Sequence, residues 1–470
     1  MSNSGWHHTL MDRLKGESAL NKAFSRGGDL GELYYEESSV TSLVLEDGRL
    51  EKVITGSDAG ISLRVVYDNH QAFAAGNALT PSALIDMAGT VASAVNQGKE
   101  IERVVIKDGP YGPAFLPQIS PDTVDTTVKA DMIRRAEKVA RQYDPRVRQV
   151  KVVYGDRAQR VAILSASGRL AADERVSVLF VVQVVASDGD RLQVGYEPVG
   201  AAMGMELLDE NSPEEIARRA AERAIMMLNA RPSPAGTMPV VLSSRAGGTM
   251  VHEAIGHGLE ADLAGEGLSV FAGRIGETVA SPLITVIDDA TLPYQRGSFA
   301  ADDEGSPAQR TVLVDKGVLK SYMYDCQTAF KAGVESTGNG RRESYRHKPV
   351  VRMTNTLIGP GETDPDEILS STREGLLVYK MGGGQVNTVN GDFVFGVSEG
   401  YLIENGQKGE PVRDATLTGN GPEILKLIDM VGNDLGFGIG TCGKDGQGVP
   451  VADAQPTLRI PAIVVGGRRE

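Results

Sequence analysis

Residues 231–257 read RPSPAGTMPVVLSSRAGGTMVHEAIGH, a stretch that combines a domain boundary with a histidine-containing motif. The boundary, Arg231 to Gly236, has two prolines and a glycine in six residues and cannot continue a helix. A short apolar strand is expected at Met238 to Leu242, and Gly247-Gly248 leads from it into a helix that carries the motif. The stretch therefore predicts a new domain that opens with a strand and a short helix.

The chain length supports a division at this point. A chain of 470 residues exceeds the roughly 250 to 300 residues that one hydrophobic core usually serves. We predict an N-terminal domain at residues 1–230 and a C-terminal domain at 231–470. The helix before the boundary has a clear start, because Ser212 is a capping residue, Pro213 fits the first turn and Glu215 completes a capping box.

The N-terminal domain is predicted to be α+β. Residues 38–66 contain strand-like stretches separated by turn signals at Asp47-Gly48 and Gly56-Ser57-Asp58. Two helices are expected next, at 80–96 and 122–143, after which strand-rich sequence resumes. This order does not match a regular series of β-α-β units.

The C-terminal domain is predicted to be mainly antiparallel β, with the motif helix near its start. Strand patterns occur at Thr285 to Asp289, Gln309 to Val314 and Phe393 to Leu402. The last two run into the tight-turn signals Asp315-Lys316-Gly317 and Glu404-Asn405-Gly406. The whole chain is therefore assigned to the α+β class.

The motif places His252, Glu253 and His257 within six residues of a chain that has only six histidines. Imidazole nitrogens suit zinc, and a nearby glutamate is the usual general base of a metallohydrolase. The histidines are five apart, which on a regular helix separates them by roughly 140°. A shared ion therefore requires a kink, a wide turn or a helix end, and Gly256 is the residue expected to allow it. The alternative is two ordinary helix positions beside a solvated glutamate.

The chain has two cysteines, so no disulfide framework is expected and a reducing compartment is favoured. Cys442 lies in the glycine-dense segment Gly436 to Gly443, which we interpret as a loop that can bring a thiolate close to an ion. Cys326 is interpreted as a structural thiol, because free cysteines are usually buried.

Three segments together resemble the TldD/PmbA family of metallopeptidases. They are the His252-Glu253-x-x-x-His257-Gly258-Leu259-Glu260 core, the late Gly440-Thr441-Cys442-Gly443 and the glycine-rich Met381 to Gln385. The likeness covers nearly the whole chain. The histidine motif is typical of the TldD branch, whereas the PmbA branch, also called TldE, lacks it. The chain thus resembles a TldD-like catalytic subunit.

The resemblance implies a set of roles and partners. His252, His257 and Cys442 would hold one zinc ion per chain, and Glu253 would activate a zinc-bound water. The substrate would be a short or unfolded polypeptide, which in this family is held as an added β-strand. The catalytic unit would be a heterodimer with a PmbA/TldE-like subunit, with a homodimer as the alternative.

The chemistry of these residues agrees with that assignment. Three protein ligands leave a tetrahedral zinc ion one open position, as in catalytic sites. Zinc lowers the pKa of a water there from about 15.7 toward about 7, and Glu253 can accept its proton. Iron or nickel can also load such a ligand set.

Composition limits the other functions. The 48 basic and 62 acidic residues give a net charge of −14, which argues against a nucleic-acid partner. The longest apolar run, Val176 to Ala186, falls short of the roughly 20 residues that cross a bilayer, so no membrane association is expected. The N-terminus has no signal-peptide pattern, and a cytoplasmic protein is predicted.

Each of three further segments has two interpretations, one functional and one purely structural. Asp302-Asp303-Glu304 is a candidate cluster for a hard metal ion, but a solvated loop is favoured. The basic segment Arg341 to Lys348 is either a site for a peptide carboxylate or, as favoured, an exposed loop. Gly382-Gly383-Gly384 is either a flexible connection or, as the family favours, the place where a peptide backbone approaches.

The sequence thus predicts a zinc-dependent peptidase, with two alternatives. A metal-dependent amidase for a small modified or cyclic substrate would use the same residues without a partner subunit. A noncatalytic zinc-binding scaffold would have no need for a base at Glu253.

Overall fold

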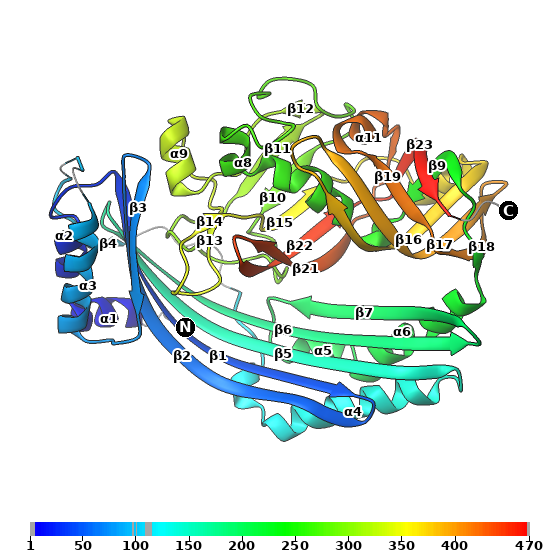
Figure 1. Cartoon of the computed structure of the whole chain (residues 1–470), viewed down its shortest axis with the longest axis horizontal. Helices are drawn as coiled ribbons and strands as arrows, with labels where there is room; N and C mark the ends of the chain where they lie inside the picture. The colour runs from blue at the N-terminus through cyan, green and yellow to red at the C-terminus, as the bar shows by residue number, and fades with distance from the viewer. Residues whose placement is uncertain (1–4, 96–97, 100, 109–114, 468–470) are drawn as a thin grey trace.

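The computed structural model describes residues 5–95, 98–99, 101–108 and 115–467 (Figure 1). Its N-terminal half is a seven-stranded sheet in the order β3-β2-β1-β5-β6-β4, with β7 paired to β6. The strands are β1 Leu30–Glu46, β2 Arg49–Tyr67, β3 His70–Gly76, β4 Lys107–Asp108, β5 Val147–Ser165, β6 Arg169–Asp188 and β7 Arg191–Ala201. Every pairing is antiparallel except that of β4 with β6.

Helices cover this sheet in two groups. Near the outer end lie α1 Trp6–Leu14, α2 Gly16–Ala23 and α3 Pro81–Ala94, whose apolar side chains share a core with β1 and β2. On the face turned away from the C-terminal half lie α4 Thr126–Gln142 and α6 Pro213–Asn229 (Figure 1). Alternate residues of β5 and β6, such as Val152 and Val182, pack under these two helices because side chains alternate along a strand.

The C-terminal half holds two larger sheets and a two-stranded ribbon. The eight-stranded sheet contains β8 Arg231–Pro232, β9 Gly236–Leu242, β16 Glu374–Val386, β17 Asp392–Glu404, β18 Gln407–Arg413, β19 Thr416–Asn420, β20 Met430–Val431 and β23 Leu458–Gly466. The six-stranded sheet contains β10 Val286–Asp289, β11 Arg310–Asp315, β12 Val318–Leu319, β15 Asn355–Ile358, β21 Gly436–Lys444 and β22 Gln447–Gln455. The ribbon is β13 Gly340–Arg341 with β14 Val350–Val351.

The remaining elements are short. The helices are α5 Glu206–Glu210, α7 Thr249–Val251, α8 Ala261–Gly265, α9 Cys326–Ala332, α10 Pro365–Ser370 and α11 Gly421–Leu427. Three 3₁₀ turns, η1 Pro121–Thr123, η2 Ser244–Ala246 and η4 His257–Leu259, and one π turn, η3 His252–Gly256, complete the set. Within the described residues, no helix combines the length and apolarity needed to cross a membrane.

The α+β class is confirmed, with mainly antiparallel pairing in both halves. In the C-terminal half, β9 with β16, β8 with β18 and β15 with β22 are parallel exceptions. Several local predictions also hold, since the Ser212 side chain accepts a hydrogen bond from the Glu215 amide at the start of α6. The Asp47-Gly48 turn is present, with φ of 49° and 76°. The division at residues 230 and 231 stays a prediction.

The predicted turn at Gly56-Ser57-Asp58 is wrong. These residues lie inside β2, where Gly56 is opposite Val40 of β1. Likewise, β5 runs without a break from Val147 to Ser165, although the strand patterns at Val150 to Tyr154 and Arg160 to Leu164 predicted two shorter strands. In both places a neighbouring strand pairs with the whole length, so tertiary pairing overrides the local turn signal.

The solvated loop expected at Asp302-Asp303-Glu304 is also wrong, because these three residues are at most 2% exposed. Glu304 pairs with Arg64 of β2, and Asp303 Oδ1 accepts a hydrogen bond from Nη1 of Arg175 of β6 at 2.6 Å. The N-terminal sheet therefore supplies the arginines that allow these carboxylates to be buried.

The exposed loop expected at Arg341 to Lys348 is wrong at its first two residues. Arg341 and Arg342 are 6% and 4% exposed. Arg342 Nη2 donates to Oε1 of Glu32 at 2.7 Å and joins the same ion network between the two halves. Only further along, at Arg346, does an exposed arginine match the expectation.

Candidate metal centre

The two motif histidines lie on a helical segment that changes its winding between them. α7 leads into the π turn η3, and the 3₁₀ turn η4 follows. The amide of His257 donates to the carbonyl of His252, which is the five-residue hydrogen bond of a π turn. This turn brings residues five apart to the same side, and the two rings lie 5.1 Å apart between centroids at 87° to each other.

Gly256 is required for a different reason from the one expected. Its φ of −55° and ψ of −54° are ordinary helical values, so the predicted use of glycine's backbone freedom is wrong. A Cβ at this position would lie 2.2 Å from Sδ of Met353. Gly256 therefore lets the chain around Met353 pack directly against the π turn.

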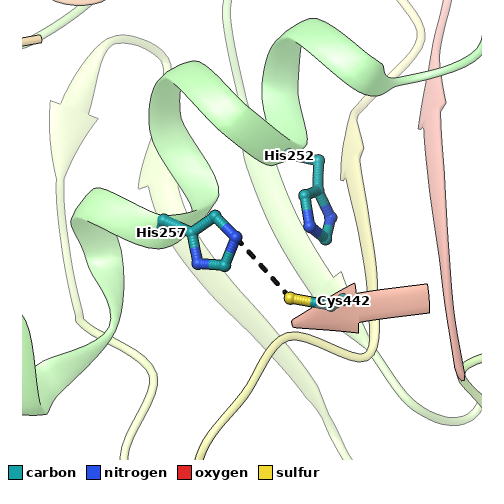
Figure 2. Close-up of side chains that lie close together, drawn as sticks. All are labelled: His252, His257 and Cys442. Atoms are coloured by element: carbon teal, nitrogen blue, oxygen red, sulfur yellow. Dashed lines mark hydrogen bonds between the residues drawn. The ribbon is translucent and has the colours of Figure 1, made fainter. Parts of the chain in front are cut away.

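Cys442 reaches the histidines from the C-terminal part of strand β21, as Figure 2 shows. The segment Gly436 to Gly443, expected to be a loop, is a strand that pairs with β22. Its glycines still serve close approach, because a Cβ at Gly436 would lie 2.1 Å from the carbonyl oxygen of Ser244. A side chain at Gly436 would push β21 away from the segment that leads into the motif.

The three predicted ligands are brought together. One donor atom from each of His252, His257 and Cys442 lies within 4.8 Å of the others. Cys442 Sγ is 3.6 Å from Nε2 of His257. Ligands about 2.0 to 2.3 Å from a tetrahedral ion are about 3.3 to 3.8 Å from one another, so this separation fits a shared zinc ion.

The electrostatics favour a thiolate. Burial alone raises the pKa of the Cys442 thiol, but its contacts with His252 and His257 outweigh burial and lower this pKa to about 5. Burial disfavours the charged form of His257, yet the carboxylate of Glu260 and the Cys442 thiolate raise the pKa of His257 to about 10. A thiolate beside two imidazoles is a ligand set that suits zinc.

A chain of polar contacts behind His257 fixes its orientation. Nδ1 of His257 lies 3.0 Å from Oε2 of Glu260, whose side chain is fully buried. Lys444 Nζ donates to the same oxygen at 3.0 Å and to Oδ1 of Asp262 at 2.8 Å. Such a contact holds a proton on Nδ1 and directs Nε2 toward Cys442.

The sequence did not single out Lys444 or Asp262. For Lys444 the only signal in the sequence is its position, because it lies two residues after Cys442 and therefore on the same face of the strand. On the other histidine, Nδ1 of His252 is buried and has no hydrogen-bond partner in the part of the chain that the structure describes. A buried ring nitrogen without a partner is unusual, and this one belongs to one of the three clustered residues.

Glu253 follows His252 directly on the π turn and is half-buried. Among the described residues, no hydrogen bond or ion pair engages its carboxylate. The motif glutamate thus lies next to a clustered histidine, with its carboxylate not committed to another described group.

A cavity of about 660 Å³ opens near the centre, although His252, Glu253, His257 and Cys442 are not among the residues that line it. Its walls include Thr249, three residues before His252, and Ile439, three residues before Cys442. Lys380 to Gly383 of β16 form another wall, and Tyr196 to Gly200 of β7 close it from the N-terminal sheet. An extended ligand in this cavity would lie between both halves of the chain.

Comparisons with known proteins assign the chain to a family. Three models match in order: PmbA/TldA metallopeptidase domain 1 at residues 31–97, the central domain at 119–228 and the C-terminal domain at 235–467. The metalloprotease TldD homolog of Haemophilus influenzae is 38% identical over 456 residues, which cover 94% of each chain. The homolog of Buchnera aphidicola from Acyrthosiphon pisum is 36% identical over 458 residues, or 96% of this chain and 95% of that one.

Two solved structures share the fold. A putative modulator of DNA gyrase from Thermotoga maritima has a TM-score of 0.80 at 24% identity, covering 98% of this chain and all of that one. TldE from Thermococcus kodakarensis has a TM-score of 0.78 at 20% identity, covering 97% and 100%. Together with the family models and the curated metalloproteases, the fold shows that this chain belongs to the PmbA/TldD family and is a metallopeptidase.

Proposed function

We propose that the chain hydrolyses peptide bonds of short or unfolded polypeptides with one zinc ion held by His252, His257 and Cys442. The observation that carries this proposal is the convergence of two imidazoles and one thiolate beside a cavity of peptide-binding size. Three ligands leave one position of a tetrahedral ion open for chemistry.

The protein's own groups then have distinct tasks. When bound, zinc polarises a carbonyl and makes a water molecule more acidic. Glu253 accepts the proton of the attacking water and can return it to the departing amine. Glu260 and Lys444 keep the His257 ring oriented, and the buried position of Cys442 shields its thiolate from solvent.

We propose that the peptide binds along the edge of β16. Strand β9 pairs with residues 376–378 only, so within the described chain residues 381–386 have β17 on one side and no strand on the other. Gly382 and Gly383 of this edge line the cavity. An added strand would gain affinity from main-chain hydrogen bonds with little demand on side chains.

We also propose that the working unit is a heterodimer with a PmbA/TldE-like subunit in a reducing compartment such as the cytoplasm. The support is the two-branched family and the two free cysteines, Cys326 and Cys442.

The experiment compares a ladder of unstructured peptides with small modified amides, each with and without a TldE-like partner. Cleavage of peptides that depends on the partner supports the proposal. Cleavage of small amides alone, without any partner, would favour the amidase alternative.

A further inference from the structure

A second cavity lies between the N-terminal sheet and the β21–β22 hairpin. It measures about 70 Å³, and its walls come from β5 and β6 on one side and from residues 296–299, 341–343 and 448–450 on the other. A single water needs about 10 to 15 Å³ measured in this way, so the cavity has room for a carboxylate and the atoms next to it.

Five arginines line this cavity, and three of them are already neutralised. The pairs are Arg157 with Glu36, Arg175 with Asp173 and Asp303, and Arg342 with Glu32. Two more acids in the wall are also engaged, because Glu343 accepts from the Gly448 amide at 2.7 Å and Glu174 lies 3.7 Å from Arg160.

Arg296 and Arg341 differ from the other three. Neither has a carboxylate within 4.0 Å among the residues that the structure describes. Arg341 is 6% exposed and donates to the carbonyls of Met353 at 2.7 Å and Pro450 at 2.8 Å. Arg296 Nε donates to the carbonyl of Gly440 at 3.2 Å. Carbonyl oxygens accept from these donors but carry no net charge, so neither guanidinium is directly paired, although Asp303 and Asp288 lie close enough to favour the charged form of Arg341.

Burial accordingly disfavours the charged form of both groups. It lowers the pKa of Arg296, and it lowers the pKa of Arg341 to about 10. The ring of Phe299 lies 5.4 Å from the guanidinium carbon of Arg341 and holds the group in place. A bound anion would remove the cost of burying these charges, and a planar guanidinium matches a carboxylate best.

The cavity adjoins the metal centre through the backbone of β21. Gly440, which accepts from Arg296, is two residues from Cys442, or about 7 Å along a strand. Pro450, which accepts from Arg341, is opposite Thr441 in the hairpin. Both arginines are therefore anchored to the hairpin that carries Cys442.

We propose that Arg296 and Arg341 form a carboxylate-binding subsite that receives the C-terminal carboxylate of a peptide substrate or product. The inference rests on the proposed peptidase function, because that function supplies such a ligand. It predicts that the enzyme favours peptides with a free C-terminus close to the cleaved bond. An acidic side chain offers the same chemistry and is the second source to be tested.

The test is calorimetric binding to the zinc-loaded chain of three probes: acetyl-trialanine, its C-terminal amide, and acetyl-Ala-Glu-Ala amide. Mass spectrometry checks that the probes remain intact. We expect the free acid to bind at least tenfold more tightly than trialanine amide. Tighter binding of the Glu-containing amide than of the free acid would contradict the assignment to the terminal carboxylate.

Two variants locate the effect. Arg296→Met and, as a milder change in the buried position, Arg341→Lys should each remove most of the difference between acid and amide. Arg310→Gln is the matched control, because this exposed arginine on β11 lies outside the cavity and should keep the difference. Equal binding of acid and amide by the unchanged protein, or a difference that survives in Arg296→Met, would overturn the proposal.

Hydrolysis of longer peptides, measured in parallel, distinguishes a failure of the proposed subsite from a failure of the proposed peptidase function. A protein that cuts peptides but does not distinguish acid from amide would refute the subsite and leave the peptidase function intact. A protein that distinguishes them but cuts no peptide even with a TldE-like partner would keep the subsite and refute the function.

Discussion

At the scale of single residues, Cys442 and Cys326 provide an internal comparison, since they are the chain's two cysteines and both are free. We expect Cys442→Ser to weaken zinc binding by more than about a hundredfold, because it removes the thiolate ligand. Cys326→Ser should bind zinc normally. Competition with a chromogenic chelator measures both affinities, and equal affinities would contradict the assigned ligand.

Zinc affinity should also rise with pH. In the metal-free protein the pKa of His257 is about 10 and that of Cys442 about 5, so at neutral pH His257 carries a proton and Cys442 does not. Binding must displace the His257 proton, and acid opposes it. Each displaced proton changes affinity about tenfold per pH unit, which predicts about a hundredfold gain from pH 6 to pH 8. A flat profile over this range, measured with the same chelator, would contradict the assignment.

More could be predicted from the sequence about which residues form the site than about the groups that surround them. A chemical pattern singles out His252, Glu253 and His257, and the family resemblance assigns Cys442 as a ligand, whereas the partners Glu260, Lys444 and Asp262 come together only through folding. Lys444 is 184 residues from Glu260 along the chain, and no local signal joins them.

At the scale of elements, the π turn is the feature on which the histidine spacing depends. The five-residue spacing predicted an irregular winding, but the kind of winding depends on what packs against it. Met353 comes from a distant segment, so the reason for Gly256 could not be predicted locally.

Gly256→Ala should therefore destabilise the protein by about 1 to 3 kcal/mol, because the new methyl group overlaps Sδ of Met353. Gly265→Ala, at the end of α8, is the control, since a Cβ there meets no atom within 4 Å. Urea unfolding gives both free energies. Equal values for the two variants would mean that the packing at Gly256 is looser than described.

The β16 edge gives a second prediction at this scale. Gly383→Val should raise the KM for peptides about tenfold at unchanged zinc content, because the new side chain would occupy the cavity that Gly383 lines. The strand itself should tolerate the change, since a Cβ at Gly383 would meet no atom within 4 Å. Gly56→Val, on the exposed part of β2, is the control. An unchanged KM in steady-state kinetics would place the peptide elsewhere.

Gly384 does not serve this test, although the sequence grouped it with Gly383. A Cβ at Gly384 would lie 1.9 Å from Cδ1 of Phe395 on the neighbouring strand. Its glycine is needed for packing within the β16–β17 hairpin, so a substitution there would disturb the strand itself.

At the scale of the whole molecule, the two halves are joined by buried charges. Glu304 and Arg64 are 240 residues apart in the chain, and Arg342 and Glu32 are 310 apart. Composition favours solvated loops for such residues, and only the meeting of the two sheets buries them. This distance explains why the α+β class could be predicted while the ion network and the arginine-lined cavity could not.

The most direct measurement of the central claim compares the unchanged chain with Glu253→Gln, each with and without a TldE-like partner. Zinc content and hydrolysis of an unstructured peptide library are determined for every sample. We predict about one zinc per chain in both proteins and cleavage only where Glu253 is present. Cleavage of equal rate by Glu253→Gln, or two zinc-loaded proteins that cut no peptide under any pairing, would contradict the account.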